Sequence, residues 1–510
     1  MLKSKIIRFE DAVDLIRDGD TVAVCGCENL LVPNKMLGAI EEKFLRAGHP
    51  GNLTEFHPII HGMGVGLGLE HFAHEGFIKT TIGSGYSYLK TSKISQMIRE
   101  NRIEAHIMPM GTAFKMIQSI ASGEEYTLTD VGINTFVDPR IEGGRMNEAT
   151  QGSLSKVITF EGKEMLCYKN PKIDIAVIRG TTADENGNLS LEEEPVTLGV
   201  CTLAMAARAC GGKVIAQVKR VAKSGSLHPK SVIVPGIMVD AIVVDEDQSF
   251  SGGEKLNPAL TGEIKIPIGS IELLPLDVQK VVISRAAEEV PKQPMTINLG
   301  VGMPVGVPKI LVEQDRMEGI TFFPEHGSVG GILGDRSIFG TNMNPDAIID
   351  STQVFHYFRG GGLDITFLGC GQVDRHGNVN VSKFNGIIPG CGGFIDIAYK
   401  TKKLVFCGTF SAGGIDVVLD NGKIKINREG KYFKFVEDVE QITLNGDEAL
   451  KKGQEVIYVT ERAVFRLEKD GIHLIEIADG VDINKELLDY IPFEIKVDRD
   501  LKKMDLKHFQ

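Results

Sequence analysis

Short apolar runs alternate with amphipathic stretches along the chain. Residues 21–25 form a continuous apolar run after a turn, and a helical pattern follows from Pro33 to about Arg46. We expect a second strand at residues 53–56. Continuous apolar runs are typical of strands buried on both faces, and strands that alternate with helices form parallel sheets with crossover connections. The pattern therefore predicts an α/β fold with largely parallel sheets.

Several of these predicted elements occur twice, in the same order. An Asp-Ile pair followed by Asp-x-x-Gly-Asn and an apolar residue appears at residues 174–189 and again at residues 364–379. One such match could arise by chance, whereas four in the same order indicate two related units. The matched segments of the first and second halves are 21–24 and 296–299, 53–54 and 320–321, 174–189 and 364–379, and 213–214 and 403–404.

The repeat predicts two related open α/β domains with largely parallel sheets, duplicated within one chain. An irregular stretch rich in Ser, Gly and Pro lies between about residues 245 and 277, and such stretches commonly separate folded units. We expect one domain at residues 1–260 and the second at residues 261–510.

Three further local patterns complete the prediction. Residues 8–17 and 281–289 have helical patterns, and Asn421-Gly422 is a typical hairpin turn. The chain ends in a charged tail whose composition favours a helix.

Composition and charge exclude several classes of protein. With 510 residues, 42% of them hydrophobic and 24% charged, the chain is typical of a globular protein with more than one domain. A net charge of −12 argues against a general nucleic-acid binder. Neither a signal peptide nor an apolar run of about 18 residues is present, so we expect a cytoplasmic protein with no membrane partner.

The cysteines and histidines do not predict a metal site. The eight cysteines are scattered without a C-x-x-C pair, and Cys25-Gly26-Cys27 has no matching second pair, so reduced buried thiols are expected. His71-x-x-His74 lacks the spacing of a zincin helix. We therefore expect no metal.

The most suggestive chemistry lies at residues 320–331. An apolar run stops at Pro324, which cannot donate to a sheet ladder, and Glu325 follows at the start of a glycine-rich turn. Ligands of open α/β sheets bind outside the carboxyl ends of the strands. Glu325 is therefore a candidate nucleophile, presented on a tight loop at such a strand end.

Two further glycine-rich loops follow predicted strands in the second half, at residues 298–304 and 389–394. If the strands are parallel, all three loops lie at one edge of the sheet, where backbone N–H groups can bind phosphate or a developing oxyanion. The first of these loops lacks the third glycine of a dinucleotide fingerprint, because Val305 occupies that position, so no nicotinamide cofactor is predicted.

Taken together, these motifs resemble the family I CoA-transferases. The resemblance rests on NLGVGMP, a Glu-x-Gly loop, FRGGGLDITFLGCGQVDRHGNVN and PGCGGFID, in this order. HFAHEG, GINTFVDPR, ISRAAEE and TERAVFRL resemble the single-chain acetate/propionate branch. The similarity covers nearly the whole chain, and in this family both halves share one α/β fold.

The resemblance implies that Glu325 is the catalytic glutamate. It would attack an acyl-CoA thioester, whose thiolate is a tolerable leaving group, and CoA would then be carried as a glutamyl-CoA thioester in a ping-pong reaction. Coenzyme A would be the transient covalent group, and the partners would be acyl-CoA and small carboxylic acids such as acetate. No metal is required by this chemistry.

The resemblance also implies further site residues. Gly393, with Gly392 adjacent and Gly390 in the same loop, would supply a backbone oxyanion donor. Family positions close to CoA fall on Asn298, Gly300, Gly302 and Asn380.

A second donor in the family is often a glutamine in a Pro-Gln-Gly-Thr context. Here Met110 takes that place, before Gly111, and a thioether cannot donate a hydrogen bond. Met110 and Gly111 remain substrate-pocket candidates, and the second donor stays open between a backbone N–H of this loop and a nearby side chain.

Two alternatives to the transferase are also compatible with these residues. An acyl-CoA hydrolase would use the same Glu325 but admit water, and a non-catalytic protein would bind acyl-CoA without turnover. A large two-half chain of this kind is also expected to form a homodimer or tetramer.

Overall fold

The computed structural model describes residues 4–62, 64, 66–249, 255–334, 338–384 and 386–510. The first half contains a seven-stranded, fully parallel sheet in the order β15-β12-β9-β1-β2-β3-β5. Its strands are β1 (Thr21–Val24), β2 (Leu53–His57), β3 (Ile78–Gly83), β5 (Glu104–Ile107), β9 (Ile175–Arg179), β12 (Lys213–Val218) and β15 (Ala241–Val244).

The second half contains an eight-stranded sheet in the order β17-β16-β22-β26-β31-β32-β33-β34. Its first five strands are parallel to one another, and β32 and β33 continue the sheet as an antiparallel meander. The strands are β16 (Met295–Leu299), β17 (Ile320–Phe322), β22 (Ile365–Gly369), β26 (Lys403–Cys407), β31 (Glu455–Val459), β32 (Ala463–Glu468), β33 (Gly471–Ile477) and β34 (Lys496–Lys503).

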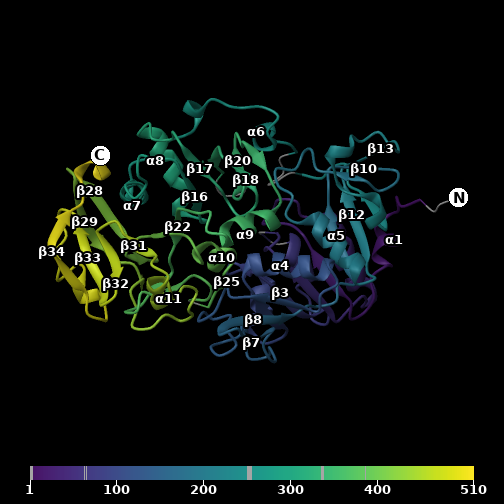
Figure 1. The fold of residues 1–510 in the computed structure, drawn as a ribbon, viewed down its shortest axis with the longest axis horizontal. Helices are drawn as coiled ribbons and strands as arrows, with labels where there is room; N and C mark the ends of the chain where they lie inside the picture. Colours follow the sequence, from purple (N-terminus) through teal and green to yellow (C-terminus); the bar gives the residue numbers. More distant parts are fainter. Residues whose placement is uncertain (1–3, 63, 65, 250–254, 335–337, 385) are drawn as a thin grey trace.

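The two sheets share one topology. The series β15-β12-β9-β1-β2 of the first half corresponds, strand for strand, to β31-β26-β22-β16-β17 of the second. This confirms the predicted α/β fold with duplicated, largely parallel sheets. The first helix, α1 (Phe9–Val13), and the last strand, β34, lie at opposite ends of the molecule (Figure 1).

The repeated sequence motif recurs because it makes the same hydrogen bonds in both halves. The carboxylate of Asp174 accepts from the N–H of Thr21 at 3.1 Å, and Asp364 accepts from Thr296 at 3.0 Å. Each carboxylate therefore ties the start of one strand to its neighbour in the sheet.

The second part of the motif builds a matched turn. The carboxylates of Asp184 and Asp374 each accept from the backbone and side-chain N–H groups of the asparagine four residues later. A glycine at positive φ lies between them in both turns, which an L side chain would strain.

Helices cover the sheets and join the halves. Near the middle of the molecule, α4 of the first half lies against α9 and α10 of the second (Figure 1). The main helices are α2 (Asn34–Ala47), α3 (Lys93–Arg99), α4 (Met110–Ala121), α5 (Val200–Ala209), α7 (Val278–Ala287), α8 (Val307–Glu313), α9 (Ser351–Arg359), α10 (Phe394–Ala398) and α11 (Gly446–Lys451).

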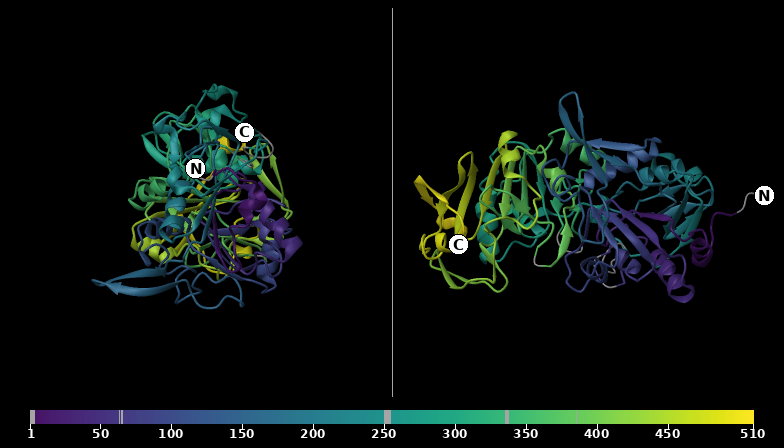
Figure 2. Two further views of the ribbon diagram at one scale, coloured as in Figure 1. Left: turned by 90° about the vertical axis from the view of Figure 1, so that its right-hand side faces the viewer. Right: turned by 90° about the horizontal axis from the view of Figure 1, so that it is seen from below.

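Smaller elements lie outside the two sheets. The hairpin of β7 (Ser155–Phe160) and β8 (Lys163–Lys169) projects from the first half (Figure 2). Helix α6 (Pro258–Thr261) spans the predicted domain boundary and packs on the second half, where the Asn344 N–H donates to the Ala259 carbonyl. The division at residue 260 itself stays a prediction.

The C-terminal region confirms one local prediction and corrects another. The hairpin of β28 (Asp416–Asp420) and β29 (Lys423–Arg428) turns at Asn421-Gly422, as expected. The predicted helical tail is wrong, because residues 496–503 form β34 at the edge of the second sheet. Pairing with β33 supplies backbone hydrogen bonds that outweigh the weak helix propensity of a charged segment.

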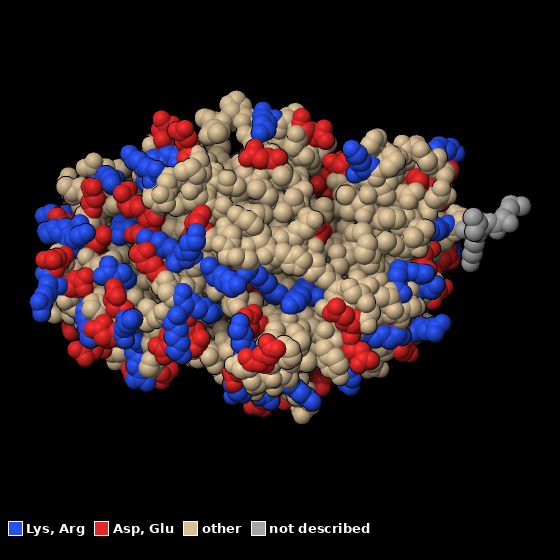
Figure 3. All heavy atoms as spheres, in the orientation of Figure 1, with Lys and Arg blue, Asp and Glu red and all other residues tan. Residues whose placement is uncertain are grey.

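The surface in Figure 3 carries lysine and arginine interspersed with aspartate and glutamate at the end that holds β28 to β34. The middle of this face carries fewer charged side chains. No helix of the described ranges is long and apolar enough to cross a membrane.

A buried ion pair of the second half, which also bonds to the first half, yields a first prediction. Asp396 on α10 is fully buried, pairs with Arg359 at 2.7 Å, and accepts from the N–H of Gly111 at 2.8 Å. Asp396→Ala leaves the guanidinium without its partner, so we expect a loss of about 3–5 kcal/mol in the free energy of unfolding, measured by urea denaturation.

The matched control removes an exposed ion pair from the same half. Arg375 pairs with Glu437, and both side chains are about half exposed. We expect Arg375→Ala to change the free energy of unfolding by no more than about 0.5 kcal/mol. Equal losses in the two variants would contradict a special role for the Asp396–Arg359 pair.

Candidate active site

Glu325 lies on the loop after β17, which ends at Phe322, with Pro324 directly before it, and the residue is only 7% exposed. Asn298, on the neighbouring strand β16, donates to the Phe323 carbonyl at 3.1 Å and lies 3.4 Å from Glu325 Oε2. The hydroxyl of Thr366 on β22 donates to Asn298 Oδ1 at 3.0 Å, which fixes the orientation of the amide. Adjacent parallel strands therefore hold the carboxylate in place.

A cavity of about 150 Å³ surrounds Glu325 and is lined by both halves of the chain. The predicted site residues Gly300, Gly390, Gly392, Gly393 and Met110 line it together with Glu325. The structure therefore brings these predicted residues together at one cavity, although they are up to 283 positions apart in the sequence.

The glycine loop reaches the cavity through a backbone contact between the halves. Strand β25 (Ile388–Gly390) pairs with β4 (Gly85–Ser87), and Gly390 lies opposite Gly85. A Cβ on Gly390 would lie 2.4 Å from the Gly85 Cα, so only glycine allows this approach.

The backbone N–H groups of Gly392 and Gly393 differ in whether they already make a hydrogen bond within the protein. The N–H of Gly392 donates to the Ser84 carbonyl at 2.8 Å. The N–H of Gly393 has no partner among the residues that the structure describes, and a Cβ built on Gly393 would lie 3.4 Å from Glu325 Oε1. Gly393 thus presents a free donor beside the carboxylate.

The loop of Met110 and Gly111 does not offer a backbone donor. The N–H of Met110 donates to the Gly392 carbonyl at 3.0 Å, and the N–H of Gly111 donates to Asp396. A Cβ on Gly111 would lie 2.5 Å from an Asp396 oxygen, so Gly111 serves close packing of α4 on α10. The Met110 side chain lines the cavity.

Four predicted residues are not among those that line the cavity: Asn298, which contacts Glu325 as described, and Asn380, Gly302 and Gly111. Asn380, on β24 (Val379–Asn380), is fully buried and donates to Gln372 and to the Lys383 carbonyl, both at 2.7 Å. Gly302 has a positive φ and faces open space, and Gly111 is enclosed as described. The predicted CoA contacts of Asn380 and Gly302 stay predictions.

Glu28 is a site residue that the sequence did not single out. It lines the same cavity, and its backbone is held at φ 47, a conformation that costs energy for a side chain of this kind. Burial, and then the charge of Glu325, raise the pKa of Glu28 to about 7. No lysine or arginine is among the described residues that line the cavity, so nothing there offsets a second negative charge.

Ser84 is the second residue missed by sequence reasoning. It follows β3 between Gly83 and Gly85, and it lines the cavity. A polar residue on a glycine-containing turn after a strand is the signal that drew attention to Glu325, and it was present here as well.

The cysteines near the site are inert thiols. Burial raises the pKa of Cys27 well above its ordinary value, and Glu28 and Glu325 raise it further. The same cause, burial, raises the pKa of Cys391. Neither thiol is a candidate nucleophile at neutral pH.

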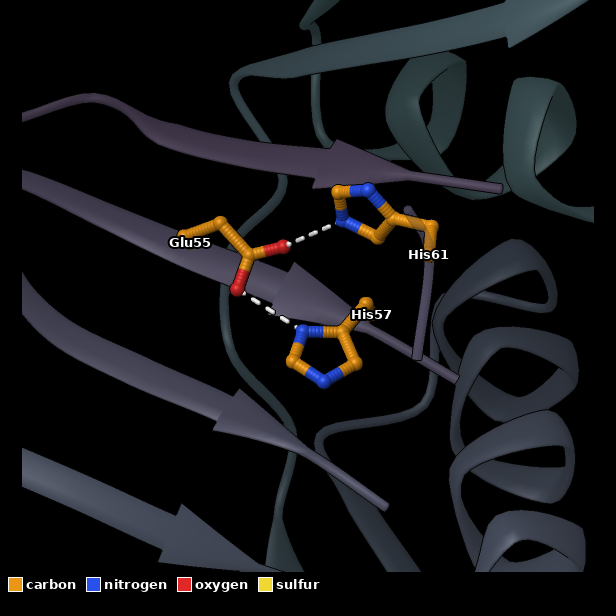
Figure 4. A group of neighbouring side chains, drawn as sticks. All are labelled: Glu55, His57 and His61. Carbon is orange, nitrogen blue, oxygen red and sulfur yellow. Dashed lines mark hydrogen bonds and ion pairs between the residues drawn. The ribbon is translucent and has the colours of Figure 1, made fainter. Parts of the chain in front are cut away.

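One buried cluster of ionisable side chains stands behind the site. Among the described residues, Glu55, His57 and His61 form the one group of three or more whose ligand atoms lie within metal-binding reach of one another (Figure 4). His57 Nδ1 and His61 Nε2 each contact one oxygen of Glu55, at 2.8 and 3.1 Å. Each contact is a hydrogen bond in which a separate carboxylate oxygen meets one imidazole.

His71 and His74, whose spacing argued against a metal, contact the carboxylate of Glu41.

The fold and the site together define a class of protein. A family model described as Coenzyme A transferase matches residues 6–245. The chain is 38% identical to acetate CoA-transferase YdiF of Escherichia coli strain K12, over 99% of this chain and 95% of that protein. It is 40% identical to caffeate CoA-transferase of Acetobacterium woodii, over 98% and 97% of the two chains.

Solved structures agree with these relatives. The apoenzyme of acyl-CoA transferase (YdiF) from E. coli O157:H7 superposes with a TM-score of 0.94 at 37% identity, over all of this chain and 96% of that chain. A thioester complex of the same protein with CoA gives a TM-score of 0.93. The chain belongs to the coenzyme A transferase family, in its family I branch, and is a transferase enzyme.

The environment of Glu28 predicts how the reaction depends on pH. Below about pH 7 its carboxyl is neutral, and above that pH it places a second negative charge beside Glu325. An anionic acceptor should then bind more weakly, so we expect its KM to rise roughly tenfold per pH unit above 7, as the neutral fraction falls. In Glu28→Gln, which cannot ionise, this rise in KM should disappear.

The readout is the KM for the carboxylate substrate between pH 6 and 9, with the KM for acyl-CoA as an internal control. A profile that is the same in both proteins would exclude Glu28 as the titrating group.

Proposed function

We propose that the enzyme moves CoA between a short-chain acyl-CoA and a free carboxylate such as acetate, through a thioester on Glu325. The observation that carries this proposal is the position of Glu325, next to the free N–H of Gly393, in a cavity between the two halves. A carboxylate beside an unpartnered amide is the pair of groups that attack on a thioester requires.

In the first step, a carboxylate oxygen of Glu325 bonds to the thioester carbonyl carbon, and the C=O electron pair moves to the oxygen. The Gly393 N–H stabilises this oxyanion. When the carbonyl re-forms, the C–S bond breaks and CoA leaves as the thiolate, which leaves a mixed anhydride on Glu325.

In the second step, the thiolate sulfur attacks the side-chain carbonyl carbon of Glu325. The bond from that carbon to the acyl oxygen breaks, the first acid leaves as its carboxylate, and a glutamyl-CoA thioester remains. A second carboxylate then runs both steps in reverse. Every proton stays where it was, and one thioester replaces another.

The two halves contribute different groups in this scheme. Residues 261–510 supply the nucleophile and its glycine loops, and residues 1–260 supply Glu28, Ser84 and Met110 as the opposite wall. Asn298 orients the nucleophile through its contact with Glu325.

The CoA chain is proposed to enter along the loop of Gly300 and Gly302. Between these glycines, Val301 lines the cavity and is 45% exposed, which places it at the mouth. Asn380 supports this side by fixing the loop that Gln372 and Lys383 belong to.

The cavity supports a small acyl group. Its volume is about 150 Å³. Many of the side chains that line it are apolar, among them Ile59, Ile60, Leu368, Phe394 and Ile397. Such a lining holds a hydrocarbon chain and keeps water away from the anhydride.

The experiment traps the intermediate. The protein is incubated with acetyl-CoA, treated with borohydride, and mapped by mass spectrometry, and we expect the reduced residue to be Glu325. Glu325→Ala and Glu325→Gln should lose the label and at least about 10³-fold in kcat, as expected when a nucleophile is removed.

The matched control is Glu318→Gln, an exposed glutamate shortly before β17, which should keep both label and rate. Full transfer by Glu325→Gln would overturn the mechanism. CoA release without an acceptor acid would identify a hydrolase instead, and binding of acetyl-CoA without turnover would identify a non-catalytic binder.

A further inference from the structure

The proposed reaction requires a second donor that the fold has not yet supplied. A tetrahedral oxyanion is commonly held by two hydrogen bonds, and Gly393 provides one of them. The N–H groups of Gly392, Met110 and Gly111 are all engaged within the protein. A side chain that lines the cavity is therefore a candidate for the second donor.

Two cavity-lining residues carry a buried polar side-chain atom without a partner in the described part of the chain: Ser84 Oγ and His326 Nδ1. His326 is turned away, because a Cβ on Gly340 would lie 2.5 Å from its Nδ1. Its ring also packs edge-on against Phe339, with ring centroids 5.7 Å apart. Ser84 remains.

The hydroxyl of Ser84 is fully buried, and a buried hydroxyl without a partner costs about 1–3 kcal/mol. The Ser84 carbonyl accepts the N–H of Gly392, the residue directly before Gly393. Ser84 of the first half is therefore hydrogen-bonded to the loop of the second half that carries the Gly393 N–H, the first donor.

We propose that the Ser84 hydroxyl donates the second hydrogen bond to the oxyanion, together with the Gly393 N–H. This inference rests on the proposed function. The proton stays on Ser84 Oγ throughout, and the hydroxyl acts only as a donor while the carbonyl oxygen is negative. It takes the part that a glutamine would take at position 110, where Met110 cannot donate.

The buried cluster of Figure 4 holds Ser84 in place from behind. His57 Nε2 contacts the Gly85 carbonyl at 2.8 Å, and its Nδ1 contacts Glu55. A Cβ on Gly83 would lie 2.0 Å from His57 Nε2, so the ring lies against the residues on both sides of Ser84. His57 is therefore a positioning residue for this hydroxyl.

The charges of the cluster suit this role. Burial opposes ionisation of both groups, yet the two histidines hold the pKa of Glu55 at about 2, and Glu55 raises the pKa of His57. The hydroxyl of Thr81 also donates to Glu55 at 2.8 Å. A charged, fully buried pair with satisfied hydrogen bonds gives the segment of Ser84 a fixed position.

The first test is Ser84→Ala. We expect kcat to fall about 10²-fold, as for loss of one oxyanion donor, with the KM for acyl-CoA changed by less than about threefold. Because the hydroxyl has no partner in the free protein, the thermal midpoint should stay equal or rise. The control is Ser87→Ala, whose hydroxyl accepts from the Leu89 N–H, and its kcat should be unchanged.

An unchanged kcat in Ser84→Ala would overturn the role of Ser84. A lowered thermal midpoint in Ser84→Ala, together with a proportionate loss of kcat in Ser87→Ala, would overturn it as well. Failure of the proposed thioester on Glu325 would be seen in a different experiment, because the native enzyme would then show no borohydride label on Glu325. In Ser84→Ala the label should still form, but more slowly.

The second test addresses His57. We expect His57→Ala to lower kcat more than it changes KM, and His57→Gln, whose amide can donate to the Gly85 carbonyl, to restore part of it. If His57 acts through Ser84, the double variant His57→Ala/Ser84→Ala should be no slower than the slower single variant. If the losses of kcat in the two single variants multiply in the double variant, the positioning role of His57 is overturned. The control is His61→Ala, which removes the other imidazole from Glu55 and should leave kcat closer to the native value.

Discussion

The backbone contact between β4 of the first half and β25 of the second is the interaction on which the site depends. Gly85 and Gly390 approach closely enough that a side chain on either would collide with the other backbone. The hydrogen bond from Gly392 to Ser84 continues the contact beyond the strand pair. Without it, Glu325 would have its own strand and loop but no opposite wall, and neither half alone encloses the cavity.

The duplicated fold explains how two halves with one topology come to contribute different chemistry. Both sheets present loops at the carboxyl ends of parallel strands, which is where ligands bind in folds of this kind. In the second half the loop after β17 carries a carboxylate, and in the first half the loop after β3 carries a hydroxyl. When two such edges face each other, the carboxylate of Glu325 and the hydroxyl of Ser84 line one cavity.

The electrostatics of the cavity follow from two buried carboxyl groups and from the absence of lysine and arginine among the described lining residues. Burial, and then the charge of Glu325, raise the pKa of Glu28, and no lysine or arginine among the described lining residues offsets the two carboxyl groups. In the proposed reaction, neutral donors, an amide and a hydroxyl, stabilise the transient negative charge. Such donors keep their strength in a water-poor cavity because they need not be desolvated during the reaction.

The sequence by itself determined the α/β class, the duplication and the loop that presents Glu325. These features are local: apolar runs, glycine turns and the repeated aspartate motif act within a few residues or between neighbouring strands. The helix expected at the C-terminus was wrong because pairing with β33, a tertiary contact, decided the conformation of a segment with weak preferences. Only the tertiary structure showed that Gly393 has a free amide while Gly392, Met110 and Gly111 do not, and that Glu28 and Ser84 belong to the site. Which amide is free, and which carboxyl is desolvated, depends on atoms brought together from opposite halves of the chain, and no local pattern encodes that distance.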